Sequence, residues 1–81
     1  MAYNRLNTEQ KAAVAALPEP LATLANDIFV DAQTQGCFHD TACDMLERGE
    51  LKDYTNAQIS EVLTTMGSYW DYTDDWGVKP A

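Results

Sequence analysis

The clearest structural pattern in the chain lies in residues 21–32, which read LATLANDIFVDA. Its apolar residues recur at i, i+3, i+4, i+7, i+8 and i+11, the stripe of an amphipathic helix with one buried face. The stripe consists of Leu21, Leu24, Ala25, Ile28, Phe29 and Ala32. Pro18 and Pro20 come just before it, and proline is tolerated in the first turn of a helix. Gly36 is placed to cap its C-terminal end.

Further helices are predicted on both sides of this one. Asn7 is a good N-cap residue and Gln10 follows three positions later, so the two form a variant of the capping box. Pro18 ends this first helix. Beyond residue 36, Asp40 is expected to cap a third, shorter helix, with Phe38 just outside the helix and packed against the core.

A fourth helix is expected to begin at Thr55, which again has a glutamine three residues later. Gly67 allows two interpretations: a glycine inside that helix, at a cost of ~1 kcal/mol, or a C-cap, with Ser68 and Asp71 opening a separate short helix. No stretch alternates strictly between apolar and polar residues, as a strand would. The sequence therefore predicts an all-α fold, a compact bundle of about four short helices in a single acidic domain, residues 1–81.

Charge is the strongest compositional feature. The 81 residues include 13 acids and 5 bases, for a net charge of −8, and 46% of the residues are hydrophobic. That hydrophobic fraction argues against disorder. Direct binding of nucleic acid or of an anionic membrane requires cationic side chains, so both are excluded, and a basic protein surface remains as the long-range partner. No apolar run approaches the ~20 residues that span a bilayer, and no signal peptide is visible, so a cytoplasmic location is expected.

The segment from Cys37 to Cys43 reads CFHDTAC and contains three residue types that bind zinc. A structural zinc site normally has four ligands in two paired sets, and the chain has no further Cys or His to complete one. A nucleophilic pair of cysteine and histidine would have to use His39, for which nothing downstream supplies an orienting group or oxyanion donors. We therefore expect reduced thiols beside a loop histidine, no metal or other cofactor, and no enzymatic activity.

Acidic residues recur at helical spacing. Asp27 and Asp31 stand at i and i+4, as do Asp40 and Asp44, and Glu47 follows three residues after Asp44. Like charges at this spacing destabilise an isolated helix by a few tenths of a kcal/mol for each pair. One interpretation is a solvated helix face; the other is an acidic stripe that meets arginines and lysines of a partner.

A second unusual stretch, residues 69–76, reads YWDYTDDW. On a helix Tyr69, Tyr72 and Trp76 would share one face, while Trp70 is expected to join the core. Tyr and Trp are favoured anchors of interfaces, because they bury much area at little conformational cost. The predicted partner-binding residues are Asp27, Asp31, Asp40, Asp44, Glu47, Tyr69, Asp71, Tyr72, Asp74, Asp75 and Trp76.

In its size, its acidity and its lack of a catalytic motif, the chain resembles small phage-encoded inhibitors, among them anti-CRISPR proteins and DNA mimics. The resemblance implies a protein that covers the basic surface of a nucleic-acid-binding protein or ribonucleoprotein in the host cytoplasm. The alternative is a helical scaffold or regulatory module, a homodimer included, that binds a partner helix through an apolar and aromatic face. In that alternative the charge only maintains solubility.

Overall fold

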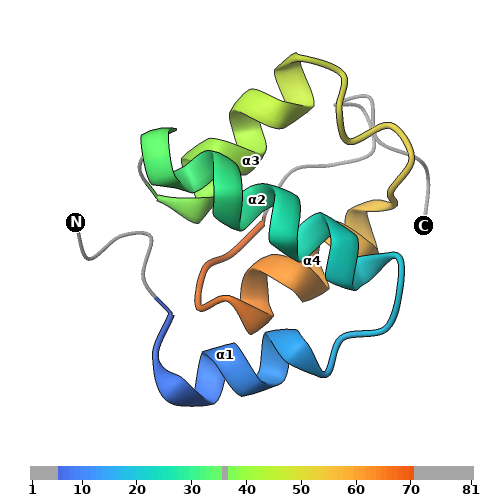
Figure 1. Cartoon of the computed structure of the whole chain (residues 1–81). Coiled ribbons are helices and arrows are strands. Elements are labelled where there is room, and N and C mark those ends of the chain that lie inside the picture. The colour runs from blue at the N-terminus through green and yellow to red at the C-terminus, as the bar shows by residue number, and fades with distance from the viewer. Residues whose placement is uncertain (1–5, 36, 71–81) are drawn as a thin grey trace.

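The computed structural model describes residues 6–35 and 37–70, and within these ranges it contains four helices and no strand (Figure 1). The helices are α1 (Thr8–Ala15), α2 (Leu21–Gln35), α3 (Phe38–Glu47) and α4 (Asn56–Thr65). The second helix, α2, packs against the other three, and α3 crosses it at a steep angle (Figure 1). The predicted all-α bundle of four short helices is confirmed.

Both predicted capping boxes form. The Asn7 side chain accepts a hydrogen bond from the Gln10 backbone N–H at 2.7 Å, and the Gln10 side chain accepts one from the Asn7 N–H at 2.9 Å. Thr55 and Gln58 make the same reciprocal pair at 3.1 and 2.8 Å. Each box satisfies two backbone donors that the first turn of a helix leaves without partners.

The predicted start of the third helix is wrong. Its N-cap is Cys37, whose Sγ accepts a hydrogen bond from the Asp40 N–H at 3.4 Å, and Phe38 is the first helical residue. Phe38 is buried, with its ring centroid 6.2 Å from that of Phe29 on α2. This contact between helices stabilises a start earlier than Asp40. Asp40 instead lies in the first turn, where its charge interacts favourably with the helix dipole.

Glycine ends both α3 and α4. Gly49 and Gly67 have φ values of +78° and +83°, a left-handed conformation that residues with a side chain rarely adopt. After α4, the Ser68 N–H donates to the Leu63 carbonyl at 2.7 Å and the Gly67 N–H to the Thr64 carbonyl at 3.0 Å. This Schellman pattern ends the helix, with Met66 as the C-cap and Gly67 as the left-handed residue directly after it, so Gly67 terminates α4 and is not a helix-interior residue. Gly36 lies outside the described residues.

The core is built from α2, α3, α4 and the segments that follow α3 and α4. Its buried apolar residues are Leu21, Leu24, Ala25, Ile28, Ala32, Phe38, Ala42, Met45, Leu46, Leu51, Ile59, Val62, Leu63, Met66 and Trp70. The predicted stripe of α2 is buried except for Phe29, which is half-buried beside the core. α1 contributes no buried residue. Among the described helices, none is both long enough and apolar enough to cross a membrane.

Candidate interaction surface

Three carboxylates form a row along the outer side of α3. Asp40 and Glu47 are exposed and Asp44 is half-buried, while the opposite side of the helix buries Phe38 and Met45. At 1.5 Å of rise per residue, Asp44 lies about 6 Å along the axis from Asp40, and Glu47 about 4.5 Å further on. No lysine or arginine occurs within α3. Asp40, Asp44 and Glu47, called the α3 acidic row below, thus present negative charge without an interspersed base.

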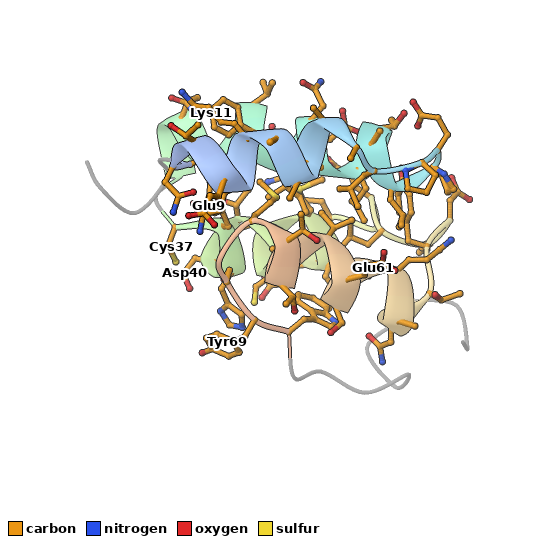
Figure 2. The ribbon with its side chains drawn as sticks, turned by 90° about the horizontal axis from the view of Figure 1, so that it is seen from below. Glu9, Lys11, Cys37, Asp40, Glu61 and Tyr69 are labelled. Atoms are coloured by element: carbon orange, nitrogen blue, oxygen red, sulfur yellow. The ribbon has the colours of Figure 1, made fainter. Side chains whose placement is uncertain are left out.

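An exposed aromatic ring lies at the N-terminal end of this row. Tyr69 is 58% exposed, and its ring stacks on that of His39 with centroids 4.4 Å apart and planes 17° apart. His39 Nδ1 is in turn 3.7 Å from an Asp40 carboxylate oxygen. Figure 2 shows Asp40 and Tyr69 at the same end of the molecule, away from Glu61. The fold thus brings together two of the predicted binding residues, Asp40 and Tyr69.

The aromatic segment is not helical at Tyr69. α4 ends at Thr65 and Tyr69 follows Gly67 in non-helical backbone, so the condition under which Tyr69 would share a helical face with Tyr72 and Trp76 is not met at Tyr69. The remaining predicted residues of this segment lie outside the described residues; they are Asp71, Tyr72, Asp74, Asp75 and Trp76.

Trp70 joins the core, as expected. It is buried, and its indole Nε1–H donates to Asn56 Oδ1 at 2.7 Å. A buried indole N–H requires such a partner. Because the ring of Trp70 is fixed against α4, the adjacent Tyr69 is held at the surface beside α3.

Asp31, on α2, is paired within the protein. Its carboxylate accepts from Arg48 Nη2 at 2.7 Å, and Arg48 Nε also donates to Glu50 at 2.9 Å. The hydrogen bond to Glu50 is the main cause of a raised pKa at Arg48, with Asp31 adding to it. The same bond lowers the pKa of Glu50. Arg48 therefore partly neutralises one predicted binding residue, Asp31.

Asp27 belongs to a cluster around a tyrosine. Burial of the Tyr54 hydroxyl raises its pKa, and the charges of Asp27, Asp53 and Glu19 raise it further, in that order. Such an effect requires the three carboxylates to lie near that hydroxyl. Asp27 and Asp31 lie one turn apart on α2. The carboxylates around Tyr54 and those paired with Arg48 are together called the α2 acidic group below; they are Glu19, Asp27, Asp31, Glu50 and Asp53.

The predicted acidic residues that the structure describes thus lie on two helices, α2 and α3. Residues 6–35 and 37–70 contain ten acids and three bases, counted along the sequence. Within those ranges, Asp27, Asp44 and Glu47 make no ion pair with a described residue. Local spacing identified the α3 acidic row, but it missed Glu19, Glu50 and Asp53. Glu19 directly precedes α2, where its carboxylate accepts from the Thr23 N–H at 3.1 Å, whereas Glu50 and Asp53 come close to the acids of α2 only through the fold.

Comparison with protein-family models, with curated proteins and with solved structures finds no match to this chain.

The residues considered for metal or nucleophilic chemistry lie on α3 and at its cap. His39 is a helical residue, so its expected place in a loop is wrong. Cys43 Sγ is 3.9 Å from both ring nitrogens of His39. These equal distances do not fit a hydrogen bond in the plane of the ring, in which the sulfur would be much closer to one nitrogen than to the other. Neither cysteine is in a disulfide, and the described ranges contain no group of three or more His, Cys, Asp or Glu that could hold a metal ion.

Proposed function

We propose that the protein is a small acidic inhibitor that covers the basic surface of a nucleic-acid-binding protein or ribonucleoprotein, as anti-CRISPR proteins and DNA mimics do. The observation that carries the proposal is the α3 acidic row, three carboxylates on one rigid helix with no base among them. Carboxylates at fixed spacing can accept charge-assisted hydrogen bonds from arginine and lysine, as phosphates do. Inhibition then requires occlusion alone and no catalytic step.

The exposed ring of Tyr69 supports an interface at this end of α3. The ring stands beside Asp40 and is held by stacking on His39, so little conformational freedom is lost when a partner covers it. An aromatic anchor framed by carboxylates suits a groove that is apolar inside and basic at its rim. We propose that the protein is of phage origin and acts in the cytoplasm of the bacterial host.

The first experiment identifies the partner and tests for inhibition. Tagged protein is incubated with bacterial lysate at low and at high salt, and the captured protein is then assayed for nucleic-acid binding with and without the inhibitor. We expect capture of a basic nucleic-acid-binding protein, release at high salt because screening weakens exposed ion pairs, and competition with nucleic acid. A captured partner that binds nucleic acid equally well in the presence of this protein would contradict the proposal.

Charge removal locates the surface. Asp40→Asn combined with Asp44→Asn removes two charges from the α3 acidic row, and we expect affinity at low salt to fall roughly tenfold, at about 0.7 kcal/mol for each lost pair. The matched control is Glu9→Gln combined with Glu61→Gln on α1 and α4, which removes the same charge and, like the test variant, one acid from a first helical turn. Equal losses in the two variants would show that only net charge matters.

A binding module for a partner helix is a second candidate, favoured by apolar exposure. Val30 and Tyr69 are the large hydrophobic residues exposed in the described part, at 57% and 58%. Affinity in this case would change little with salt, because burial of apolar area is not screened. Sedimentation of the protein alone and a salt titration of the captured complex separate the two candidates.

A further inference from the structure

An apolar groove between α1 and α2 is not used by either candidate function. It has a volume of about 330 Å³. Val14 and Ala15 of α1 form one wall and Ala22 and Phe29 of α2 the other, with Met66 also in the lining. The side chain of Met66 belongs to the core, being only 2% exposed, so the groove opens at the surface and reaches the core. Pockets for small ligands begin at about this volume and are mostly apolar.

The groove exists because the residues on both sides of it are small. Ala15 and Ala22 face a space that longer side chains would fill, and α1 contributes no buried residue to the core. Close packing is the rule in protein interiors. A gap of this size between two helices therefore leaves apolar surface that a bound molecule can cover.

Among the described residues that line the groove, Lys11 is the only charged one. It extends from α1 on the side toward α2 (Figure 2), and its ammonium group makes no ion pair with the residues in the described ranges. No acidic residue of the described ranges lines the groove, although these ranges contain ten acids. A single cation beside an apolar space, in a chain of net charge −8, complements a ligand with an apolar body and one anionic group.

We propose that this groove binds a small anionic amphiphile, such as a medium-chain carboxylate, with its chain against Phe29 and Met66 and its carboxylate at Lys11. A volume of 330 Å³ lies at the lower end of the range for small-ligand pockets, about 300–1,000 Å³, and so suits a short chain rather than a large ligand. A partner helix is some 10–12 Å wide and could place only single side chains in this space, so the volume favours the small molecule.

Octanoate is a suitable probe, because it is a medium-chain carboxylate and is charged at neutral pH. The full chain labelled with ¹⁵N is titrated with octanoate, with the neutral 1-octanol and with the cationic octylammonium. We expect octanoate to shift the backbone amides of α1 and of the Ala22–Phe29 part of α2, with an affinity on the order of millimolar. Shifts spread over the whole chain, or none up to several millimolar, would overturn the proposal.

Two substitutions test the two halves of the ligand. Lys11→Gln should weaken octanoate roughly two- to fivefold, the range for one exposed ion pair, and leave octanol unchanged; Lys52→Gln, at a base outside the groove, is the matched control. Ala22→Leu should abolish the shifts from both ligands by filling the groove. If circular dichroism shows that Ala22→Leu does not fold, Ala15→Leu, at an exposed position of α1, replaces it as the variant that fills the groove. Octanoate binding that survives the filling substitution would overturn the site, and equal weakening by the two lysine variants would overturn the role of Lys11.

Discussion

Tyr54 is the residue at which the gathering of acids beside α2 has a measurable consequence. Its pKa is raised first by burial and then by Asp27, Asp53 and Glu19, because each of them disfavours the tyrosinate. A raised pKa in the folded state means that Tyr54 contributes stability that is fully present below pH 10.0, its ordinary value. That contribution is lost as the pH rises through the folded-state pKa.

Asp27→Asn should therefore lower the pKa of Tyr54 toward its ordinary value, and the loss of stability on the alkaline side should become smaller. Tyrosinate absorbance measures the titration, and the Tyr54→Phe variant identifies its share among the four tyrosines of the chain. Glu61→Gln, on α4, removes an equal charge and should leave this pKa in place, because Glu61 is not among its causes. An unchanged Tyr54 titration in Asp27→Asn would mean that Asp27 does not belong to the α2 acidic group.

Arg48 shifts the pKa of Glu50 in the direction opposite to the shift at Tyr54. Its hydrogen bond lowers the pKa of Glu50 below the ordinary value of 4.5. Glu50 therefore contributes stability above that pH, and the contribution is lost as the pH falls through the folded-state pKa. Arg48→Gln should raise the pKa of Glu50, measured by NMR of the side-chain carboxyl carbon. In Lys52→Gln, which removes a neighbouring charge without this hydrogen bond, the pKa of Glu50 should stay lowered.

At the scale of the helices, the end of α4 depends on α1. A Cβ atom at Gly67 would clash with the side-chain amide of Gln10, whereas one at Gly49 would only reach ordinary contact, at 3.4 Å, with the Lys52 side chain. Gln10 is the residue that completes the capping box of α1. Gly67 thus serves two helices: its positive φ ends α4, and its missing side chain leaves room for the cap of α1.

This difference predicts unequal costs for the same substitution. Gly49→Ala should lower the free energy of unfolding by about 1 kcal/mol, the cost of a left-handed alanine. Gly67→Ala should cost about 2 kcal/mol, since displacing Gln10 weakens a cap as well. Urea unfolding of both variants measures the difference. Adding Gln10→Ala to each should remove the excess at Gly67, because the side chain that clashes is then absent; equal costs in the two single variants would contradict the contact.

Helix starts and stops were predictable from the sequence wherever the signal is local. The capping boxes at Asn7 and Thr55 use residues three positions apart, and both form. The start of α3 was missed because Phe38 is placed by Phe29 on another helix, and a thiol took the cap expected of Asp40. The sequence does not decide between the two interpretations of Gly67 for a related reason, since propensity does not determine whether a glycine ends a helix.

The candidate surface shows the same difference between local signals and contacts that depend on packing. Asp40, Asp44 and Glu47 share a face because helical spacing alone requires it. The pairing of Asp31 with Arg48 joins residues 17 positions apart, and the stacking of Tyr69 on His39 joins the segment after α4 to α3. Neither contact has a periodic signature, so both depended on the packing of the bundle.

For the molecule as a whole, the excess of acids acts against its own stability. The chain carries a net charge of −8 on a body whose longest dimension is 33 Å. The screening length is about 30 Å at 0.01 M salt and about 10 Å at 0.1 M. At low salt, therefore, the α3 acidic row and the α2 acidic group repel each other across the molecule, whereas at higher salt only neighbouring charges interact.

Added NaCl should therefore stabilise the fold while it weakens the proposed complex. Between about 0.01 M and about 0.3 M we expect a gain on the order of 1 kcal/mol, which for a domain of this size raises Tm by roughly 4–8 °C. Partner affinity should fall over the same range, because its ion pairs are screened. Near pH 4.2, the isoelectric point, the net charge vanishes and the rise in Tm should shrink. A Tm that falls with salt at neutral pH would mean that attraction around Arg48 outweighs the repulsion, and an affinity that rises with salt would favour the apolar interface instead.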